Sequence, residues 1–165
     1  MFLFGESDDY ETLNYQYKVK KYDALRVYLD CSIGNLAMKA GNNRYIITGN
    51  IKYNSMLSKP VVGLTDKNNI SRLDLKIKPN NSSTEDNSKS LINSLIEDGN
   101  DNYKIKFEMP TKMSTDMYLD FGLGKADLDL TDLRISQLVI DLSLIHISEP
   151  TRRTPMSNAV FCLKK

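Results

Sequence analysis

The sequence predicts an all-β fold, a single-domain β-solenoid-like stack of short strands, and three observations favour it. Apolar and polar residues alternate with a period of two along most of the chain, which is typical of strands with one buried and one wet face. The alternating segments are roughly five to eight residues long, and Gly, Asn, Asp or Pro separates them. A strand–bend–strand unit also occurs twice. A β-sandwich is the alternative arrangement of the same strands.

Four strands are expected in the first half of the chain. Residues 13–20, LNYQYKVK, alternate apolar and polar side chains, and residues 25–30, LRVYLD, do the same. Residues 44–53, RYIITGNIKY, are β-branched and aromatic, and residues 70–77, ISRLDLKI, set Leu and Ile against charged side chains. Each segment therefore predicts a half-buried strand.

The second half continues the pattern after one interruption. Residues 80–102 are rich in Ser, Asn, Asp and Glu, and the apolar spacing within them predicts a short amphipathic helix in a surface insertion. Its apolar face is formed by Leu91, Ile92, Leu95 and Ile96. Strand alternation resumes at residues 103–109, 113–120 and 133–140.

The internal repeat links two segments that lie 90 residues apart. Residues 28–38 read YLDCSIGNLAM and residues 118–128 read YLDFGLGKADL, with Tyr, Leu, Asp and Gly shared. We expect both units to follow the same strand–bend–strand path, because such repeats bury their apolar faces by stacking. Leu29 and Leu119, and Ile33 and Leu123, should then point into the core. The glycines at the bends, Gly34, Gly122 and Gly124, should supply a positive φ or a close backbone approach.

Composition excludes several classes of protein. The 165 residues suffice for one domain with a core, and 22 basic against 21 acidic residues argue against a nucleic-acid-binding protein. No apolar run approaches 18 residues, and the N-terminus lacks a complete signal peptide, so this chain is expected to hold neither a transmembrane segment nor a signal peptide. The acidic run at 97–102 does not match the spacing of a calcium-binding loop. No cofactor or metal is therefore expected.

The last segment of the chain resembles a sequence of a different origin from the rest. Residues 142–165, LSLIHISEPTRRTPMSNAVFCLKK, resemble the in-frame translation of a transposase-type sequencing adapter, and we interpret them as an artefactual tail. A natural basic tail is the alternative. We expect residues 148–165 to have no defined place in the fold, because an adapter sequence was never selected to pack.

Without this tail the remaining chain offers little for catalysis. The tail holds four basic residues, one acidic residue, His146 and Cys162, which leaves 18 basic and 20 acidic residues, one cysteine (Cys31) and no histidine in residues 1–141. Ser-His-Asp and Cys-His catalysis and the usual Cys/His zinc sites are thereby excluded. A lone Cys31 is typical of a small buried side chain.

Three residue clusters still permit a functional interpretation. The aspartates in and after the second repeat, Asp127, Asp129 and Asp132 with Asp120, could form an acidic ladder for calcium. Asp120, Asp127 and Asp129 could instead be the carboxylates of a β-solenoid hydrolase. The basic residues Lys18, Lys20, Lys21 and Arg26 lie among tyrosines, a mixture that can bind single-stranded nucleic acid. Tyr15, Tyr17, Tyr45 and Tyr53 are the candidate aromatic residues of a glycan-binding groove. For the charged clusters, we favour solvated strand faces.

Two stretches resemble a known family. The first, VYLDCSIGNLAMKAGNNRYIITGNIKYNSMLSKPVV (27–62), is followed by the strand ISRLDLKIK (70–78), and the second is YKIKFEMPTKMSTDMYLDFGLGKADLDLTDLRISQLVID (103–141). Both are similar to the toast-rack domains found in LiaF-like cell-envelope stress proteins and in related adhesins. Tyr103 stands where the family has Trp, and the further β units of the family are missing after Ile140.

This resemblance implies a division of the chain and a set of structural positions. Residues 1–23 would be an N-terminal lead-in strand, residues 24–141 a toast-rack-like β domain truncated at its C-terminus, and residues 142–165 the tail. The motif positions Gly34, Gly122, Gly124, Asp129 and Leu130 would be structural, with no catalytic or cofactor-binding role.

The function implied is non-enzymatic. We expect an interaction or sensor domain of the bacterial cell-envelope stress response, which presents β faces or a sheet edge to a protein or peptide partner. Membrane association would depend on a missing N-terminal segment, and an open, truncated end of the stack should cause self-association. The alternatives are a surface adhesin or glycan-binding domain, and the hydrolase that would use Asp120, Asp127 and Asp129.

Overall fold

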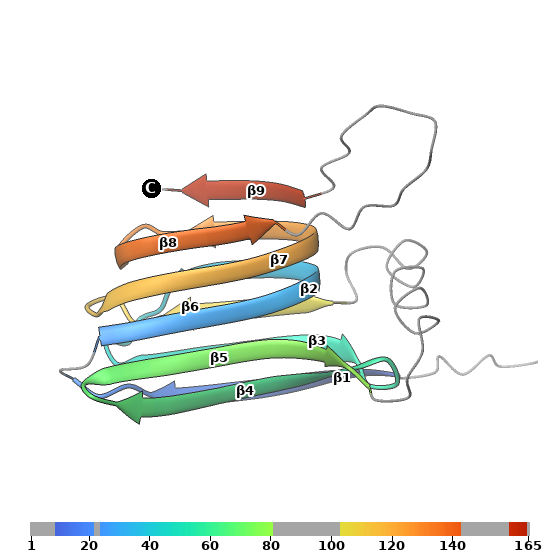
Figure 1. Ribbon diagram of the computed structural model, residues 1–165, viewed down its shortest axis with the longest axis horizontal. Helices are drawn as coiled ribbons and strands as arrows, with labels where there is room; N and C mark the ends of the chain where they lie inside the picture. The colour runs from blue at the N-terminus through green and yellow to red at the C-terminus, as the bar shows by residue number, and fades with distance from the viewer. Residues whose placement is uncertain (1–8, 22–23, 81–102, 143–158, 165) are drawn as a thin grey trace, which may run out of the picture.

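The computed structural model describes residues 9–21, 24–80, 103–142 and 159–164, and this part of the chain is all-β without a helix (Figure 1). The helix expected within residues 80–102 lies outside the described residues. The nine strands are β1 (Tyr10–Lys18), β2 (Ala24–Ala40), β3 (Ile46–Asn54), β4 (Ser58–Lys67), β5 (Ile70–Pro79), β6 (Lys104–Met109), β7 (Ser114–Asp129), β8 (Arg134–Leu142) and β9 (Ala159–Lys164).

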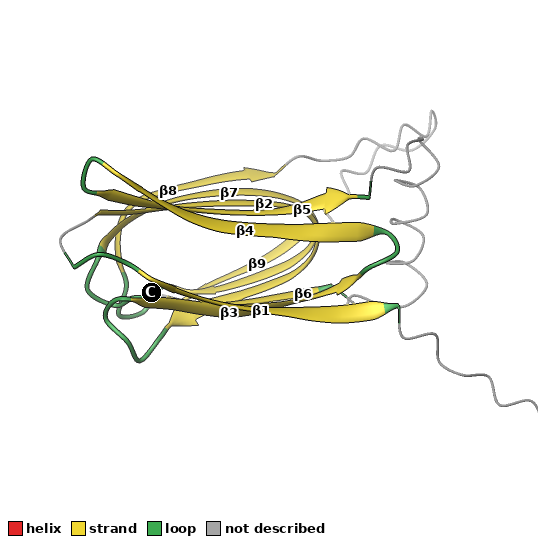
Figure 2. Ribbon diagram, turned by 90° about the horizontal axis from the view of Figure 1, so that it is seen from below, coloured by secondary structure: helices red, strands yellow, loops and turns green. Residues whose placement is uncertain are grey.

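The strands form two layers that enclose the core (Figure 2). The long strands β2 and β7 turn back on themselves, so that the first half of each lies in one layer and the second half in the other. The first layer has the order β4-β5-β2-β7-β8, and the second has the order β1-β3-β6-β2-β7-β9. Both layers are mixed, because β4–β5, β1–β3 and β3–β6 are antiparallel pairs and the others are parallel. The solenoid-like stack is confirmed.

The two copies of the internal repeat form the central pair of strands in this stack. Strands β2 and β7 pair in parallel, with Tyr28 opposite Tyr118, Gly34 opposite Gly124 and Met38 opposite Leu128. The two repeat units therefore follow the same path, as predicted. Leu29 and Leu119 are both buried. The side chains of Ile33 and Leu123 lie outside the described residues.

The buried face changes from odd to even positions at the bend. In β2 the inward residues are odd-numbered up to Cys31 and even-numbered from Leu36 onward, and β7 switches in the same way between Phe121 and Ala126. A strand normally keeps its faces with a period of two. Each bend therefore holds one extra residue, which keeps the apolar side chains on the inside of both layers.

Gly34 and Gly124 lie at these bends in a backbone conformation that L-residues rarely adopt. Their φ angles are 130° and 144°. A Cβ atom on Gly124 would lie 1.9 Å from the carbonyl oxygen of Gly34, and one on Gly34 would lie 3.0 Å from the Cβ of Tyr103. The stacked bends therefore depend on glycine for both conformation and space.

The core between the layers is apolar and includes Cys31. Its inward residues are mostly Leu, Ile, Val, Met and Phe, with Tyr15 at one margin. Cys31 is fully buried, and this burial, with the nearby Asp30 and Asp120, raises the pKa of its thiol to about 12. The thiol is therefore a packed apolar group rather than a reactive one.

A pH dependence of stability follows from Cys31. An unfolded thiol ionises near pH 9.0, whereas the folded one stays protonated to about pH 12, so the unfolded state binds fewer protons between these values and stability falls as pH rises. The slope per group is at most about 1.4 kcal/mol per pH unit. Urea denaturation at pH 8 and pH 10.5 should show the loss, and Cys31→Val should make it smaller. An equal loss in that variant would contradict the assignment.

The C-terminal tail contains a strand, which corrects one expectation. Residues 148–165 were expected to have no place in the fold, but Ala159–Lys164 forms β9 and pairs in parallel with the second half of β7. The pairing places Ala159 opposite Gly124 and Lys164 opposite Asp129. An apolar, β-prone segment beside an unpaired strand edge is sufficient for such pairing, whatever the origin of the segment.

Strand β8 lies at the end of the first layer. In the described part of the chain it pairs with β7 alone, so its other backbone edge has no strand beside it. Its inward residues are only half-buried, although they pack against the core. These residues are Ile135, Leu138 and Ile140. The first layer therefore ends in an incompletely covered apolar face.

Candidate functional site

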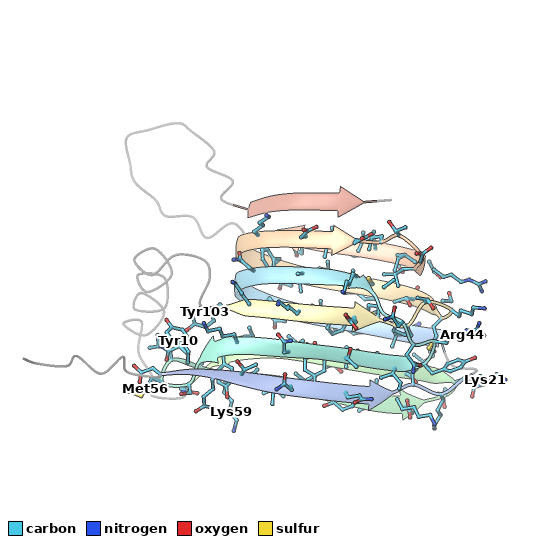
Figure 3. All side chains as sticks on the ribbon, turned by 180° about the vertical axis from the view of Figure 1, so that it is seen from behind. Tyr10, Lys21, Arg44, Met56, Lys59 and Tyr103 are labelled. Atoms are coloured by element: carbon cyan, nitrogen blue, oxygen red, sulfur yellow. The ribbon has the colours of Figure 1, made fainter. Side chains whose placement is uncertain are left out.

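The outer surface of the second layer, the side of the molecule that faces the viewer in Figure 3, carries a row of lysines. The row crosses four strands, because Lys52 of β3 lies opposite Lys104 of β6, Lys104 opposite Asn35 of β2, and Asn35 opposite Lys125 of β7. We call Lys52, Lys104, Asn35 and Lys125 the lysine row. Side chains of one register position share a face of the sheet, so the three cations point outward together.

A hollow lies beside the lysine row. Its volume is about 250 Å³, and Asn35, Ala37, Lys104, Lys106, Lys125 and Asp127 line it together with the backbone of the strands. It continues into a groove of about 610 Å³ that also contacts Lys39, Thr48, Glu108 and Asp129. The exposed Ala37 is the smallest side chain of the shared lining and leaves the space between the lysines open.

The two ends of this groove differ in charge pairing. At one end Lys39 Nζ lies 3.1 Å from Glu108 Oε1, and the Thr48 hydroxyl donates to Glu108 Oε2 over 3.3 Å. At the other end neither Lys106 nor Lys125 has a carboxylate within 4.0 Å among the described residues. Lys52 Nζ lies 5.5 Å from the ring centroid of Tyr10. The outer surface beside the lysine row therefore carries both cationic side chains and the carboxylate of Asp127.

The three aspartates considered for hydrolysis do not converge. Asp127 and Asp129 line the groove on the outside of the second layer. Asp120 precedes the bend of β7 and lies in the first layer, where it pairs in register with Asp30 and Asp141. No group of three His, Cys, Asp or Glu side chains among the described residues could hold a metal ion. The three carboxylates that the hydrolase alternative requires therefore do not form a cluster. The aspartates of the proposed calcium ladder likewise form no group of ligands among the described residues.

The tyrosines considered for glycan binding all pack against the core, Tyr15 buried and the other three partly exposed. Tyr15 is buried, which raises the pKa of its hydroxyl, and the other three candidates pack against the core cluster. The Tyr17 hydroxyl donates to the carbonyl of Val62 over 3.0 Å, and the Tyr53 hydroxyl donates to Glu11 Oε2 over 2.8 Å. The hydrogen bond to Glu11 raises the pKa of Tyr53. Tyr15 and Tyr17 line an open space of about 590 Å³ between β1 and β4, but Tyr45 and Tyr53 do not border it, so the four candidates form no common aromatic groove.

Two of the four basic residues near the N-terminus, Lys20 and Arg26, are paired with carboxylates. Lys20 pairs with Asp66 at 3.5 Å, and Arg26 pairs with Asp116 at 3.6 Å on the outside of the first layer. Lys18 ends β1, which belongs to the second layer. Figure 3 shows Lys21 at one end of the molecule and Tyr10 and Tyr103 at the other.

Asp129 and Leu130 lie where β7 turns into β8. The Asp129 carboxylate accepts a hydrogen bond of 3.1 Å from the backbone N–H of Thr131, and the N–H of Leu133 donates to the carbonyl of Leu130 over 3.2 Å. Leu130 packs against the core. Gly122 is half-buried near the bend of β7, and its φ is not positive.

The outer surface of the first layer carries a pair of stacked tyrosines. The rings of Tyr28 and Tyr118 are 4.7 Å apart and 6° from parallel. Arg72 lies 4.1 Å from the centroid of Tyr28 and forms two hydrogen bonds of 2.8 Å with Asp74. In the register, Tyr118 lies directly opposite Tyr28 on one side, and Asp74 lies opposite it on the other, with Arg72 at the diagonal position. Such contacts stabilise the sheet and leave no flat ring platform for a ligand.

Sequence reasoning missed the lysine row, although part of its signal was visible. Lys104 and Lys106 were recognised only as the polar face of a strand. The repeat aligns Asn35 with Lys125 in sequence, so the pairing of these two members of the row could have been predicted from it. The pairing of β6 with both β3 and β2, which brings Lys52 and Lys104 together, has no counterpart in the sequence pattern.

Two solved structures are similar to this chain, and the first shows the same fold. The crystal structure of a putative cell adhesion protein from Clostridium sporogenes is 17% identical, with a TM-score of 0.58, and the match covers 81% of this chain and 58% of that one. That of a putative adhesin from Bacteroides fragilis is 12% identical, with a TM-score of 0.33 and coverages of 93% and 61%. This chain thus spans about three fifths of the length of these proteins. No curated protein matches its sequence.

The family of the chain is shown by a match that covers most of its length. Among the described residues, no helix has the length and apolar character needed to cross a membrane. A family model described as the N-terminal domain of toast_rack, DUF2154, matches residues 5–145, which include all strands from β1 to β8. The chain therefore belongs to the toast_rack N-terminal domain family.

Proposed function

We propose that this domain works at the bacterial cell envelope, in the response to envelope stress, as a non-enzymatic module that presents a sheet edge to a protein or peptide partner. Membership of the toast_rack family supports the envelope setting. The separation of Asp120 from Asp127 and Asp129, and the core position of Cys31, support a binding role over a catalytic one.

The observation that carries the proposal is the open end of the first layer at β8. This strand offers an unpaired backbone edge within the described residues, beside apolar side chains that are half-buried. Val139, on its outer face, is 41% exposed. An extended segment that pairs with β8 would gain main-chain hydrogen bonds and would cover these side chains. A second copy of the chain is the partner that tests this directly, because a free edge also permits self-association.

Two matched substitutions test which edge is used. Val139→Lys places a charge on β8, and Val61→Lys places the same charge on β4, the edge strand at the opposite end of the layer, where Val61 is 45% exposed. Size-exclusion chromatography with light scattering should show that the unmodified chain and Val61→Lys self-associate, whereas Val139→Lys is monomeric, because a charge on an edge strand opposes pairing. A monomeric unmodified chain, or association lost only in Val61→Lys, would overturn the proposal.

A surface adhesin is the second candidate. The putative cell adhesion protein from Clostridium sporogenes, which has the same fold, supports it. The candidate aromatic residues do not add support, because Tyr15 is buried and Tyr17, Tyr45 and Tyr53 pack against the core. Direct binding of the purified domain to host-cell or matrix proteins would favour adhesion over the edge-pairing function.

A further inference from the structure

We propose that a second copy of the chain pairs with β8 in an antiparallel register centred on Leu138, and that two contacts between Arg134 and Asp141 select this register. The inference rests on the proposed edge-pairing function and names the partner of the same edge. Strand β8 is the last described strand of the first layer, and its outer backbone edge has no strand beside it among the described residues (Figure 1). Two identical edges can close into a symmetric dimer, because each copy offers the other the same surface.

The pairing of β8 with β7 fixes the face of the sheet to which each side chain of β8 points. The register places Ile135 opposite Thr115 and Gln137 opposite Asp116, so it passes over Ser136. Such a β-bulge inserts one extra residue into a strand. The inward side chains are therefore Ile135, Leu138 and Ile140, which are half-buried, and the outward ones are Arg134, Gln137, Val139 and Asp141, which are exposed.

Once the bulge is passed over, the sequence of β8 is complementary to itself in the antiparallel direction. If Leu138 lies opposite Leu138 of the second copy, then Ile135 lies opposite Ile140. Arg134 at the start of one strand then lies opposite Asp141 at the end of the other. Each inward residue thus meets an inward residue, and each outward residue an outward one, as a continuous sheet requires.

The two charged residues at the ends of β8 are available for this contact. Neither Arg134 nor Asp141 has an oppositely charged group within 4.0 Å among the described residues. Asp141 is the last of three carboxylates at one register position, after Asp30 and Asp120. At the other end of this row, Lys76 lies 3.9 Å from Asp30. An arginine beside Asp141 would place a cation at the second end as well, and opposite charges in directly opposed positions stabilise a sheet.

The same register covers the apolar residues at the open end of the first layer. Leu138 of each copy would lie at the two-fold axis, with Ile135 of one chain against Ile140 of the other on either side. These side chains already pack against the core of their own chain. Pairing would therefore join the two first layers into one continuous layer, and the apolar area that it removes from water favours association.

Charge reversal tests the register. Arg134→Asp and Asp141→Arg each replace two attractive contacts per dimer by two repulsive ones, whereas the double variant restores both contacts with the signs exchanged. Arg44→Asp is the control, because Arg44 is exposed and lies outside the strands. Size-exclusion chromatography with light scattering over a range of concentrations gives the dissociation constant of each dimer. Circular dichroism checks that each variant is folded.

Each single reversal should weaken self-association at least about tenfold, and the double variant and the control should stay within about threefold of the unmodified chain. Single variants that associate as tightly as the unmodified chain, or a double variant as weak as the single ones, would overturn the register and leave the edge-pairing function standing. Equal weakening by Arg44→Asp would also overturn the register. A monomeric unmodified chain would overturn both.

A disulfide locates the two-fold axis. Directly opposed residues of antiparallel strands have Cα atoms about 4.5–5.5 Å apart, a distance that a disulfide spans. Leu138→Cys should therefore give a covalent dimer on oxidation, whereas the two copies of Ile140→Cys would lie roughly 14 Å apart and should not. The unmodified chain, which contains Cys31 and Cys162, gives the background. A covalent dimer with Ile140→Cys but not with Leu138→Cys would overturn the register.

Discussion

Gly124→Ala should destabilise the domain by more than about 3 kcal/mol, because two separate costs add at this position. The residue has a φ of 144°, which an alanine rarely adopts. Its new Cβ would also lie 1.9 Å from the carbonyl oxygen of Gly34 in the adjacent bend. Relief of that overlap would require β2 and β7 to separate where they are paired in register.

Gly63→Ala is the matched control for this change. Gly63 lies in β4, its φ is not positive, and a Cβ there would meet nothing within 4 Å. Its effect should be within about 0.5 kcal/mol. Gly34→Ala should lie between the two, because its Cβ would be 3.0 Å from the Cβ of Tyr103. Urea denaturation followed by circular dichroism gives the order, and a mild Gly124→Ala would show that the bends can move apart.

Leu73→Ala should cost about 2–5 kcal/mol, whereas Leu138→Ala should cost about 1 kcal/mol. The two leucines belong to one inward row of the first layer, which runs from Leu64 through Leu73, Val27 and Met117 to Leu138. Leu73 is fully buried, because strands flank it on both sides. Leu138 is half-buried, because β8 is the last described strand of its layer.

The comparison of these two variants tests the open end independently of self-association. It is made by urea denaturation at a protein concentration where Val139→Lys is monomeric, with that substitution present in both variants. A Leu138→Ala effect as large as that of Leu73→Ala would show that other residues cover β8. The edge-pairing function would then lose its structural basis.

The strands could be predicted from sequence because in-and-out alternation is a local property. Residues 25–30 and 70–77 fall in strands with the expected inward faces, and so do residues 104–109 of the expected segment 103–109. The repeat predicted the register of β2 and β7, because identical units can stack with identical faces inward. Strand β4 lacks clear alternation, since its position on the edge leaves residues such as Val61 and Gly63 outside the core.

The candidate site could not be predicted in the same way, because it depends on which strands become neighbours. Alternation places Lys52 and Lys104 on the polar face of their strands, but only the pairing of β3 with β6 places one opposite the other. The pairing of β9 with β7 could not be predicted for the same reason. Its residues were assigned to a tail on grounds of origin, whereas pairing with β7 requires only a compatible edge.

The pairing of β2 with β7 also bears on how the chain reaches its folded state. These strands join residues that are 90 positions apart, as in the hydrogen bond from the N–H of Lys125 to Asn35 Oδ1. Contacts of such long range require a large loop to close before they contribute, and proteins dominated by them fold slowly. On the ribosome, the central ladder can form only after synthesis has passed residue 129. Until then β2 is without its principal partner, and its apolar residues remain accessible to chaperones and to other nascent chains.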